Sequence, residues 1–289
     1  MRLPPTVFPE LGYCVYCGNT KDELTKEHII PYAINGSYIL PQASCSSCSS
    51  ITSKFEDKFT RVNYGQYRLN KNYSSRNKKK RRTTQICHIF DEGNKNEIEV
   101  KFTDLPNVFP AWKLPTPGIL RGAEPSIIIP ESEMLIMFDK KNGVEKFLQF
   151  HKCNKLNITF DFHVSPFLKL LAKIGHCYAH ALTLGKGYQA LLPNIIIGNS
   201  EYASHYIGGI EKDCIPNNEY APLTLSIRYG VKKAFLVVRI QLLNPGALPP
   251  YQTVAGYIPN LEYFCEINGL NYEECLANMR AYPLGNNIV

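Results

Sequence analysis

Two Cys-x2-Cys pairs, Cys14/Cys17 and Cys45/Cys48, constrain the fold of this chain more than any other feature of its sequence. Their four thiolates are the ligand set of a closed tetrahedral zinc site, because a two-residue gap lets one tight turn aim both sulfurs at one ion. The 27 residues between the pairs exceed the about 15–20 of a simple zinc ribbon. We therefore expect a structural zinc site with an element inserted between its two knuckles. The other cysteines are scattered, and we expect them to be small buried hydrophobic residues: Cys87, Cys153, Cys177, Cys214, Cys265 and Cys275.

The positive charge of the chain is concentrated in one block. Residues 61–90 carry nine Lys and Arg and no acid, while each flanking region carries one more acid than base, so this block accounts for the net charge of +7. A local cationic stretch on a near-neutral chain is typical of a polyanion binder, most often a nucleic-acid binder. The alternative is a solvated flexible loop. The residues expected to contact a nucleic-acid backbone are Arg68, Lys71, Arg76, Lys78, Lys79, Lys80, Arg81 and Arg82.

No apolar run in the 289 residues approaches the roughly 18–20 needed to cross a bilayer. The first residues also lack the apolar core of a secretion signal. We therefore expect a cytoplasmic protein with no membrane partner. A homodimer is one of the oligomeric states that the sequence allows.

The remainder of the chain alternates short apolar runs with Gly, Pro and Asn, which predicts strands. Ser165-Pro166 offers an N-cap and a first-turn proline, and apolar residues at helical spacing then predict a helix up to Gly185. His176 and His180 lie four residues apart on this helix; without a Glu after the first histidine we favour core packing over metal ligation. The expected strands lie at residues 127–129, 134–138, 147–150, 158–162, 195–197, 223–229, 234–243 and 251–257.

The insert between the knuckles reads Glu27-His28-Ile29-Ile30-Pro31. His28 is a natural general base, since imidazole titrates near neutral pH, and Glu27 offers a hard oxygen for Mg²⁺ or Mn²⁺. In an ideal strand these two side chains face opposite sides, so the strand must end or twist if both are to reach one phosphate. The alternative is a half-buried histidine in a strand that Pro31 ends.

The order Cys-x2-Cys, Glu-His-Ile-Ile-Pro, Cys-x2-Cys over about residues 11–62 resembles the HNH endonuclease family, and the chain looks similar to its standalone bacterial members. The resemblance implies a ββα-metal module braced by zinc. The strand and helix pattern of the remaining chain predicts a larger α+β domain with a mostly antiparallel sheet, so the expected fold class is α+β. The expected division is residues 1–62 for the module, 63–85 for a segment contacting nucleic acid, and 86–289 for an accessory domain.

The resemblance further implies a metal-dependent hydrolysis of phosphodiester bonds in DNA, leaving 5′-phosphate and 3′-hydroxyl ends. His28 would activate the attacking water as general base, and Glu27 would ligate a catalytic Mg²⁺ or Mn²⁺. The cysteines would hold a separate structural Zn²⁺.

The sequence departs from the family pattern after the second knuckle. There the family usually has Asn or His as a further metal ligand, and this chain has Ser49, a weak ligand. Asn35 is the nearest match to the middle asparagine of the family name. We expect a helix that begins near Cys45 or Ser46. On this helix Ser49, Ser53 and Glu56 share one face, so Glu56 is the candidate second acidic ligand, or else an ordinary solvated glutamate. Ile51, Phe55, Phe59 and Val62 form the expected core stripe.

Two rival functions remain at this stage. One is a zinc-ribbon nucleic-acid-binding protein whose catalysis has lapsed, a hypothesis that Ser49 motivates. The other assigns the main activity, such as ligand binding, to the C-terminal domain, with the zinc module as a structural appendix.

Overall fold

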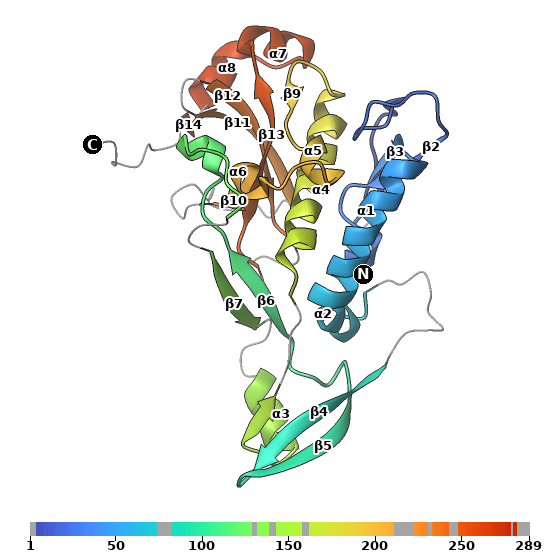
Figure 1. Ribbon diagram of the computed structural model, residues 1–289, viewed down its shortest axis with the longest axis vertical. Helices are drawn as coiled ribbons and strands as arrows, with labels where there is room; N and C mark the ends of the chain where they lie inside the picture. The colour runs from blue at the N-terminus through green and yellow to red at the C-terminus, as the bar shows by residue number, and fades with distance from the viewer. Residues whose placement is uncertain are drawn as a thin grey trace, which may run out of the picture.

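The fold is described from a computed structural model over residues 4–73, 83–128, 132–138, 143–157, 162–210, 222–230, 233–242, 248–278 and 280–281. The architecture is α+β with mostly antiparallel sheets, as the sequence predicts. Three parts are visible in Figure 1: an N-terminal module, a large sheet with its helices, and a small lobe at the far end. Among the helices of the described residues, none combines the length and the apolar character of a membrane span.

The N-terminal module is a β-hairpin followed by a helix. Strand β2 (Leu24–His28) pairs antiparallel with β3 (Tyr38–Cys45), and β1 (Thr6–Val7) lies parallel on the other edge of β3. The 3-10 turn η1 (Tyr32–Ile34) connects the two hairpin strands. Helix α1 (Ser46–Lys58) follows β3 directly and continues through the π-helical turn η2 (Phe59–Asn63) into α2 (Gly65–Asn70).

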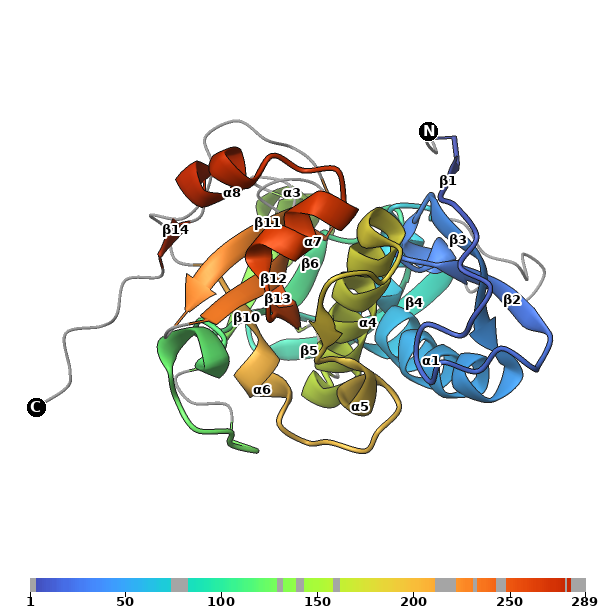
Figure 2. The same cartoon turned by 90° about the horizontal axis from the view of Figure 1, so that it is seen from above.

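The large sheet has the strand order β10-β13-β12-β11-β14, with β9 also paired to β13. Its central strands β12 and β13 consist largely of apolar residues. Helix α4 (Val164–Thr183) packs against one face of these two strands and buries them. Figure 2 shows α4 between this sheet and the N-terminal module. The strands are β9 (Gln189–Ala190), β10 (Ile207–Gly209), β11 (Leu223–Gly230), β12 (Lys233–Ile240), β13 (Tyr251–Ile258) and β14 (Arg280–Ala281).

Four short helices and a 3-10 turn complete this part of the chain. They are η4 (Gly118–Arg121), α5 (Pro193–Ile196), α6 (Ala203–Tyr206), α7 (Leu261–Ile267) and α8 (Tyr272–Asn278).

The small lobe has its own core. Strands β5 (Asn94–Lys101), β4 (Thr84–Asp91) and β8 (Lys155–Asn157) form a sheet beside α3 (Gly143–Phe150), around a cluster that includes Cys87. The hairpin of β6 (Val108–Lys113) and β7 (Glu133–Phe138) lies between this lobe and the large sheet (Figure 1).

Several local predictions are confirmed and several are wrong. Residues 147–150 lie in α3, since a short apolar run fits either periodicity. Residues 195–196 lie in α5, which begins at Pro193, a favoured first helical residue. Residues 127–128 form a bend, and α4 begins at Val164, before the expected cap. Residues 129 and 158–161 are outside the described ranges. The strands expected at 134–138, 223–229, 234–243 and 251–257 are present as β7, β11, β12 and β13, although β12 ends at Ile240.

One hydrophobic cluster joins the N-terminal module to the large sheet. It contains Cys14 and Phe59 from the module together with Phe167 and Ile174 from α4 and Leu236 from β12. The stripe expected along α1 is only partly buried: Phe55 and Phe59 are in the core, whereas Ile51 is half-buried and Val62 is exposed. The module therefore folds against α4 and shares a core with it.

The close packing of α4 on β13 gives a testable requirement for glycine. A Cβ added at Gly175 would overlap the side-chain hydroxyl of Thr253, whereas one added at Gly65 would meet nothing. We expect Gly175→Ala to lower the free energy of unfolding by about 1–3 kcal/mol through overpacking. Gly65→Ala, the control, should be neutral or slightly stabilising. Equal urea midpoints for the two variants would contradict the described packing.

Candidate functional site

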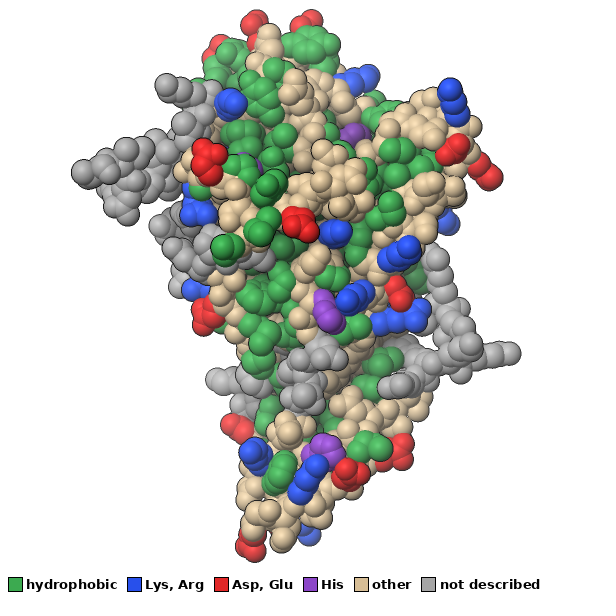
Figure 3. Space-filling view, in the orientation of Figure 1, with side chains coloured by type: hydrophobic (Ala, Val, Ile, Leu, Met, Phe, Trp, Pro, Cys, Tyr) green, Lys and Arg blue, Asp and Glu red, His purple; other side chains and the backbone are tan. Residues whose placement is uncertain are grey.

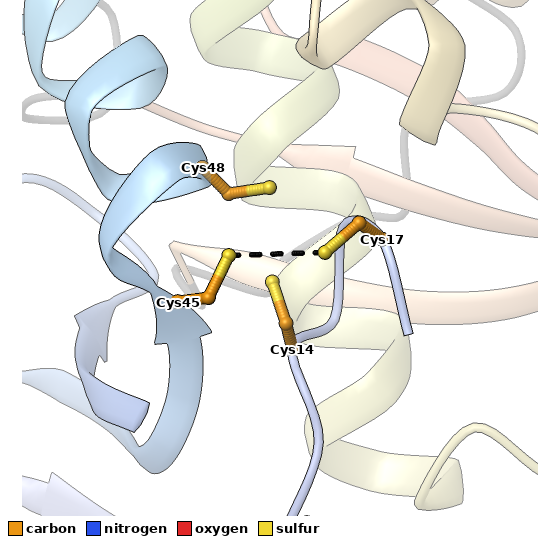
Figure 4. A group of neighbouring side chains, drawn as sticks. All are labelled: Cys14, Cys17, Cys45 and Cys48. Carbon is orange, nitrogen blue, oxygen red and sulfur yellow. Dashed lines mark hydrogen bonds between the residues drawn. The ribbon is translucent and has the colours of Figure 1, made fainter. Parts of the chain in front are cut away.

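The four paired cysteines converge on one point. The sulfurs of Cys14, Cys17, Cys45 and Cys48 all lie within 4.8 Å of one another. Figure 4 shows them pointing inward, two from the loop before β2 and two from the junction of β3 and α1, with Cys17 and Cys45 sulfurs 3.8 Å apart. Four convergent thiols at this spacing fit a tetrahedral zinc ion.

Local backbone geometry explains each knuckle. The turn of the first knuckle is closed by a hydrogen bond from the Gly18 N–H to the Cys14 carbonyl at 2.8 Å. Gly18 has φ +73°, a conformation that favours glycine. The second lies where β3 becomes α1, so that Cys45 occupies the N-cap and Cys48 the first turn. The Val15 N–H donates to the Ala43 carbonyl at 2.9 Å, which ties the two knuckles together.

The start of α1 favours a thiolate at Cys45. Burial raises the pKa of this thiol, but the backbone N–H of Cys48 and the neighbouring cysteines outweigh burial, so the pKa is lowered overall. Unpaired N–H groups at a helix N-terminus stabilise negative charge in the same way. Burial raises the pKa values of the Cys17 and Cys48 thiols, so Cys45 is the cysteine at which the helix start favours the thiolate.

Strand β2 ends at His28 and separates the two candidate catalytic side chains. Glu27 is buried and His28 is half-buried, in keeping with the alternation of a strand. The pairing with β3 is irregular between Thr25 and Glu27, where Gln42 on the partner strand adopts φ +43°. The His28 ring meets the Tyr32 ring edge-on, with centroids 5.8 Å apart.

The carboxylate of Glu27 is paired with a lysine from α4. Lys173, which has no exposed surface, places its Nζ 2.8 Å from Glu27 Oε1 and 2.7 Å from Glu56 Oε1. The same ammonium donates to the carbonyl of His28 and, at 3.3 Å, to that of Ile29. Burial lowers the pKa of Lys173, but the attraction of Glu27 and Glu56 outweighs burial and raises the pKa overall. The lysine therefore remains charged.

The polar face of α1 is only partly directed toward this ion pair. Glu56 reaches Lys173, and its side chain is 23% exposed. The Ser53 side chain is exposed and donates to the Ser50 carbonyl at 3.0 Å, while Ser49 is half-buried. Asn35 follows the η1 turn with φ +64° and ends it as a left-handed cap.

These positions bear on the divalent ion that the sequence led us to expect at Glu27, Ser49, Ser53 and Glu56. A cation bound between the two carboxylates would lie against the Lys173 ammonium, and like charges at that distance repel strongly inside a protein. As arranged here, the pair does not fit such an ion. Within the described ranges, the four cysteines form the sole cluster of three or more metal-ligating side chains.

The basic stretch is described only at its start. Arg68 donates from Nε to the Ala33 carbonyl at 2.6 Å and from Nη1 to the Thr60 carbonyl at 3.0 Å, so it links α2 to the hairpin connection. Lys71 lies over the Tyr67 ring at 5.9 Å. On the face in Figure 3, Lys and Arg side chains are scattered among acidic ones and form no single patch in the part of the surface that is described. Arg76, Lys78, Lys79, Lys80, Arg81 and Arg82 lie outside the described residues.

The two helix histidines serve packing, as expected. His176 and His180 are buried, and burial is the main reason that both pKa values are lowered, that of His180 to about 4. His176 Nε2 lies 2.7 Å from the Val15 carbonyl, inside the first knuckle, and its ring stacks on Tyr16. The Tyr16 hydroxyl and the Cys177 sulfur are 3.3 Å apart. Helix α4 thus contacts the zinc knuckle as well as the His28 segment.

The scattered cysteines follow their prediction in part. Cys87, Cys177 and Cys265 are buried, whereas Cys153 and Cys275 are half-buried, and Cys214 lies outside the described ranges.

Comparison with protein families decides what this module is. Residues 14–63 match the model of the HNH endonuclease family. Residues 14–63 form an HNH endonuclease domain. The matched range begins at the first knuckle and ends with η2, so it covers the β-hairpin, all four cysteines and α1. Comparisons with curated proteins and with solved structures gave no match. The HNH domain implies a nuclease acting on nucleic acid, with a divalent ion in its chemistry.

Lys173 is the site residue that sequence reasoning missed. It lies 110 positions beyond residue 63, outside the HNH domain. The available signal was a lysine within Leu170-Leu171-Ala172-Lys173-Ile174, on a helix predicted to be buried. A lysine is almost never fully buried unless it is paired, so this position called for an acidic partner.

The zinc site gives a direct prediction. We expect Cys14→Ser or Cys45→Ser to lose the bound zinc and unfold the module, because zinc binding contributes to folding free energy. Cys153→Ser is the matched control, since this cysteine lies in the small lobe, away from the cluster. Zinc content of the purified proteins, together with circular dichroism, checks the prediction. Full zinc occupancy in the Cys14 and Cys45 variants would refute the four-cysteine site.

Proposed function

We propose that this protein is an endonuclease that hydrolyses phosphodiester bonds in DNA with His28 as general base. The observation that carries the proposal is the position of His28: it ends β2 of an HNH domain, half-buried, with its ring packed edge-on against Tyr32. An imidazole that is still partly open to water can accept a proton from an attacking water molecule.

In the proposed reaction, His28 accepts a proton from a water molecule whose oxygen attacks the phosphorus. The bond between phosphorus and the 3′ oxygen breaks, and the leaving oxygen takes up a proton, which yields 5′-phosphate and 3′-hydroxyl ends. We expect the reaction to require Mg²⁺ or Mn²⁺, which would supply charge stabilisation at the phosphate. The Glu27–Glu56 pair, which Lys173 occupies, is not proposed as the ligand of that ion. The zinc at the cysteines braces the domain and takes no part in the reaction.

Residues 63–85 would hold the DNA backbone, and residues 86–289 would complete and position the HNH domain. The high charge of the 76–82 stretch, together with its place in the sequence a few residues after the end of α2, supports the first assignment. The shared hydrophobic cluster and the contacts of α4 support the second.

The central test is plasmid cleavage with Mg²⁺ or Mn²⁺. We expect His28→Ala to lower the cleavage rate by roughly 100- to 10,000-fold, the range that general bases contribute. His88→Ala is the control, because this histidine pairs with Glu97 in the small lobe and lies outside the HNH domain. Equal rates for wild type and His28→Ala would refute the assignment. Binding of DNA without cleavage in any metal would favour the lapsed-catalysis alternative.

A second test concerns the basic stretch. Replacing Lys78, Lys79, Lys80, Arg81 and Arg82 with Gln should weaken DNA binding and flatten its dependence on salt, by up to about 0.9 in log–log slope for each DNA phosphate that the variant no longer neutralises. Lys95→Gln with Lys101→Gln, both exposed on β5, is the control for loss of positive charge outside the stretch, and its effect is compared per charge removed. Binding affinity over a salt series measures both effects. An unchanged slope in the five-residue variant would assign the stretch to solubility alone.

A further inference from the structure

One lysine outside the HNH domain makes four polar contacts within it. The Lys173 ammonium reaches Glu27 Oε1 and the carbonyls of His28 and Ile29 at the end of β2. It also reaches Glu56 Oε1 on α1. These acceptors come from both elements that build the catalytic half of the domain, so this one cation fixes β2 against α1.

Electrostatics favour the two carboxylates with the Lys173 ammonium between them over the same two carboxylates without a cation. Lys173 has no exposed surface, and the side chain of Glu27 is only 9% exposed. The side chain of Glu56 is 23% exposed. Two carboxylates that share one ammonium would repel each other without it, and a buried ammonium likewise requires paired acceptors. Each charge at this site is therefore stabilised by the others.

The position of the ammonium is set by the packing of α4 on both sides. One turn and a half before Lys173, the Phe167 ring stacks on Phe59 of η2 at 5.9 Å. Three residues after it, His176 meets the Val15 carbonyl of the first knuckle. A lysine side chain is flexible, but its Cα is held between two anchors that both belong to the HNH domain.

We propose that Lys173 is the positioning residue of the HNH site and the fixed cation of Glu27 and Glu56. In this role Lys173 orients the end of β2, which carries His28. The two carboxylates form ion pairs with the lysine and do not hold a divalent ion between them. The effect on catalysis rests on the proposed nuclease function, whereas the ion pair and its effect on metal binding do not.

The first experiment measures Mn²⁺ binding by electron paramagnetic resonance on the full chain without DNA. Glu56→Gln should change the Mn²⁺ dissociation constant by less than threefold, because Glu56 is engaged by Lys173. Asp57→Asn is the matched control, since Asp57 is the next carboxylate on α1, is exposed and pairs with Arg61. A tenfold or greater weakening in Glu56→Gln alone would make Glu56 a metal ligand and overturn the proposal.

The second experiment removes the cation. Lys173→Met should lower the thermal unfolding midpoint far more than Lys169→Met, a change one turn earlier on α4 at a half-buried position. The double variant Lys173→Met with Glu56→Gln should recover part of the lost unfolding midpoint. Without the ammonium the two carboxylates repel each other, and Glu56→Gln removes one of their charges. Where Lys173→Met folds, its Mn²⁺ affinity should rise at least tenfold. Equal midpoints for the two lysine variants, or no recovery in the double variant, would overturn the proposal.

Kinetics with DNA separate positioning from mere packing. In steady-state kinetics over a range of DNA concentrations, Lys173→Met should lower kcat at least tenfold with KM within threefold of wild type, while Lys169→Met changes neither. An unchanged kcat in a folded, cleaving Lys173→Met would refute the positioning role. If the wild type cleaves no DNA in any metal, the proposed function fails, and the Mn²⁺ and unfolding results still decide the ion pair on their own.

Discussion

The buried ammonium of Lys173 is the interaction on which the arrangement of the candidate site depends. It neutralises part of the charge of Glu27 and Glu56 and holds the backbone at His28. Removing one partner of a buried ion pair is costly, because the remaining charge stays in a poorly solvating interior. The packing around it is close: a Cβ at Gly175 of α4 would overlap Thr253 of β13, and the Phe167 ring of α4 contacts the rings of Phe59 and Tyr251.

The four-cysteine site and helix α4 both contribute to the stability of the HNH domain. The cysteine site closes the hairpin and α1 into a unit, as small modules require when their own core is limited. Helix α4 then supplies the hydrophobic face that α1 and the knuckle lack, through Phe167, Ile174 and His176. The HNH domain is thus defined by its cysteines in the sequence and completed by a distant helix in space.

Short sequence patterns predicted those features of the structure that depend on residues close together in the chain. The cysteine spacing predicted the metal site, the run after the second knuckle predicted α1, and alternating apolar residues predicted β11, β12 and β13. The strands predicted at residues 147–150 and 195–197 were wrong, because short apolar runs do not distinguish a strand from a helical turn. Lys173 was missed for a different reason: its partners Glu27 and Glu56 are more than 100 residues away, and only the fold brings them together.

The distance in sequence between the HNH domain and Lys173 also affects when the site forms during synthesis. A ribosome that has completed residue 63 must add 110 more residues before Lys173 exists. At about 5–20 residues per second this takes on the order of ten seconds, and still longer until α4 leaves the exit tunnel. A nascent chain that already carries both knuckles and His28 therefore lacks the lysine that fixes β2 against α1. The domain reaches its final arrangement only after most of the chain has been translated.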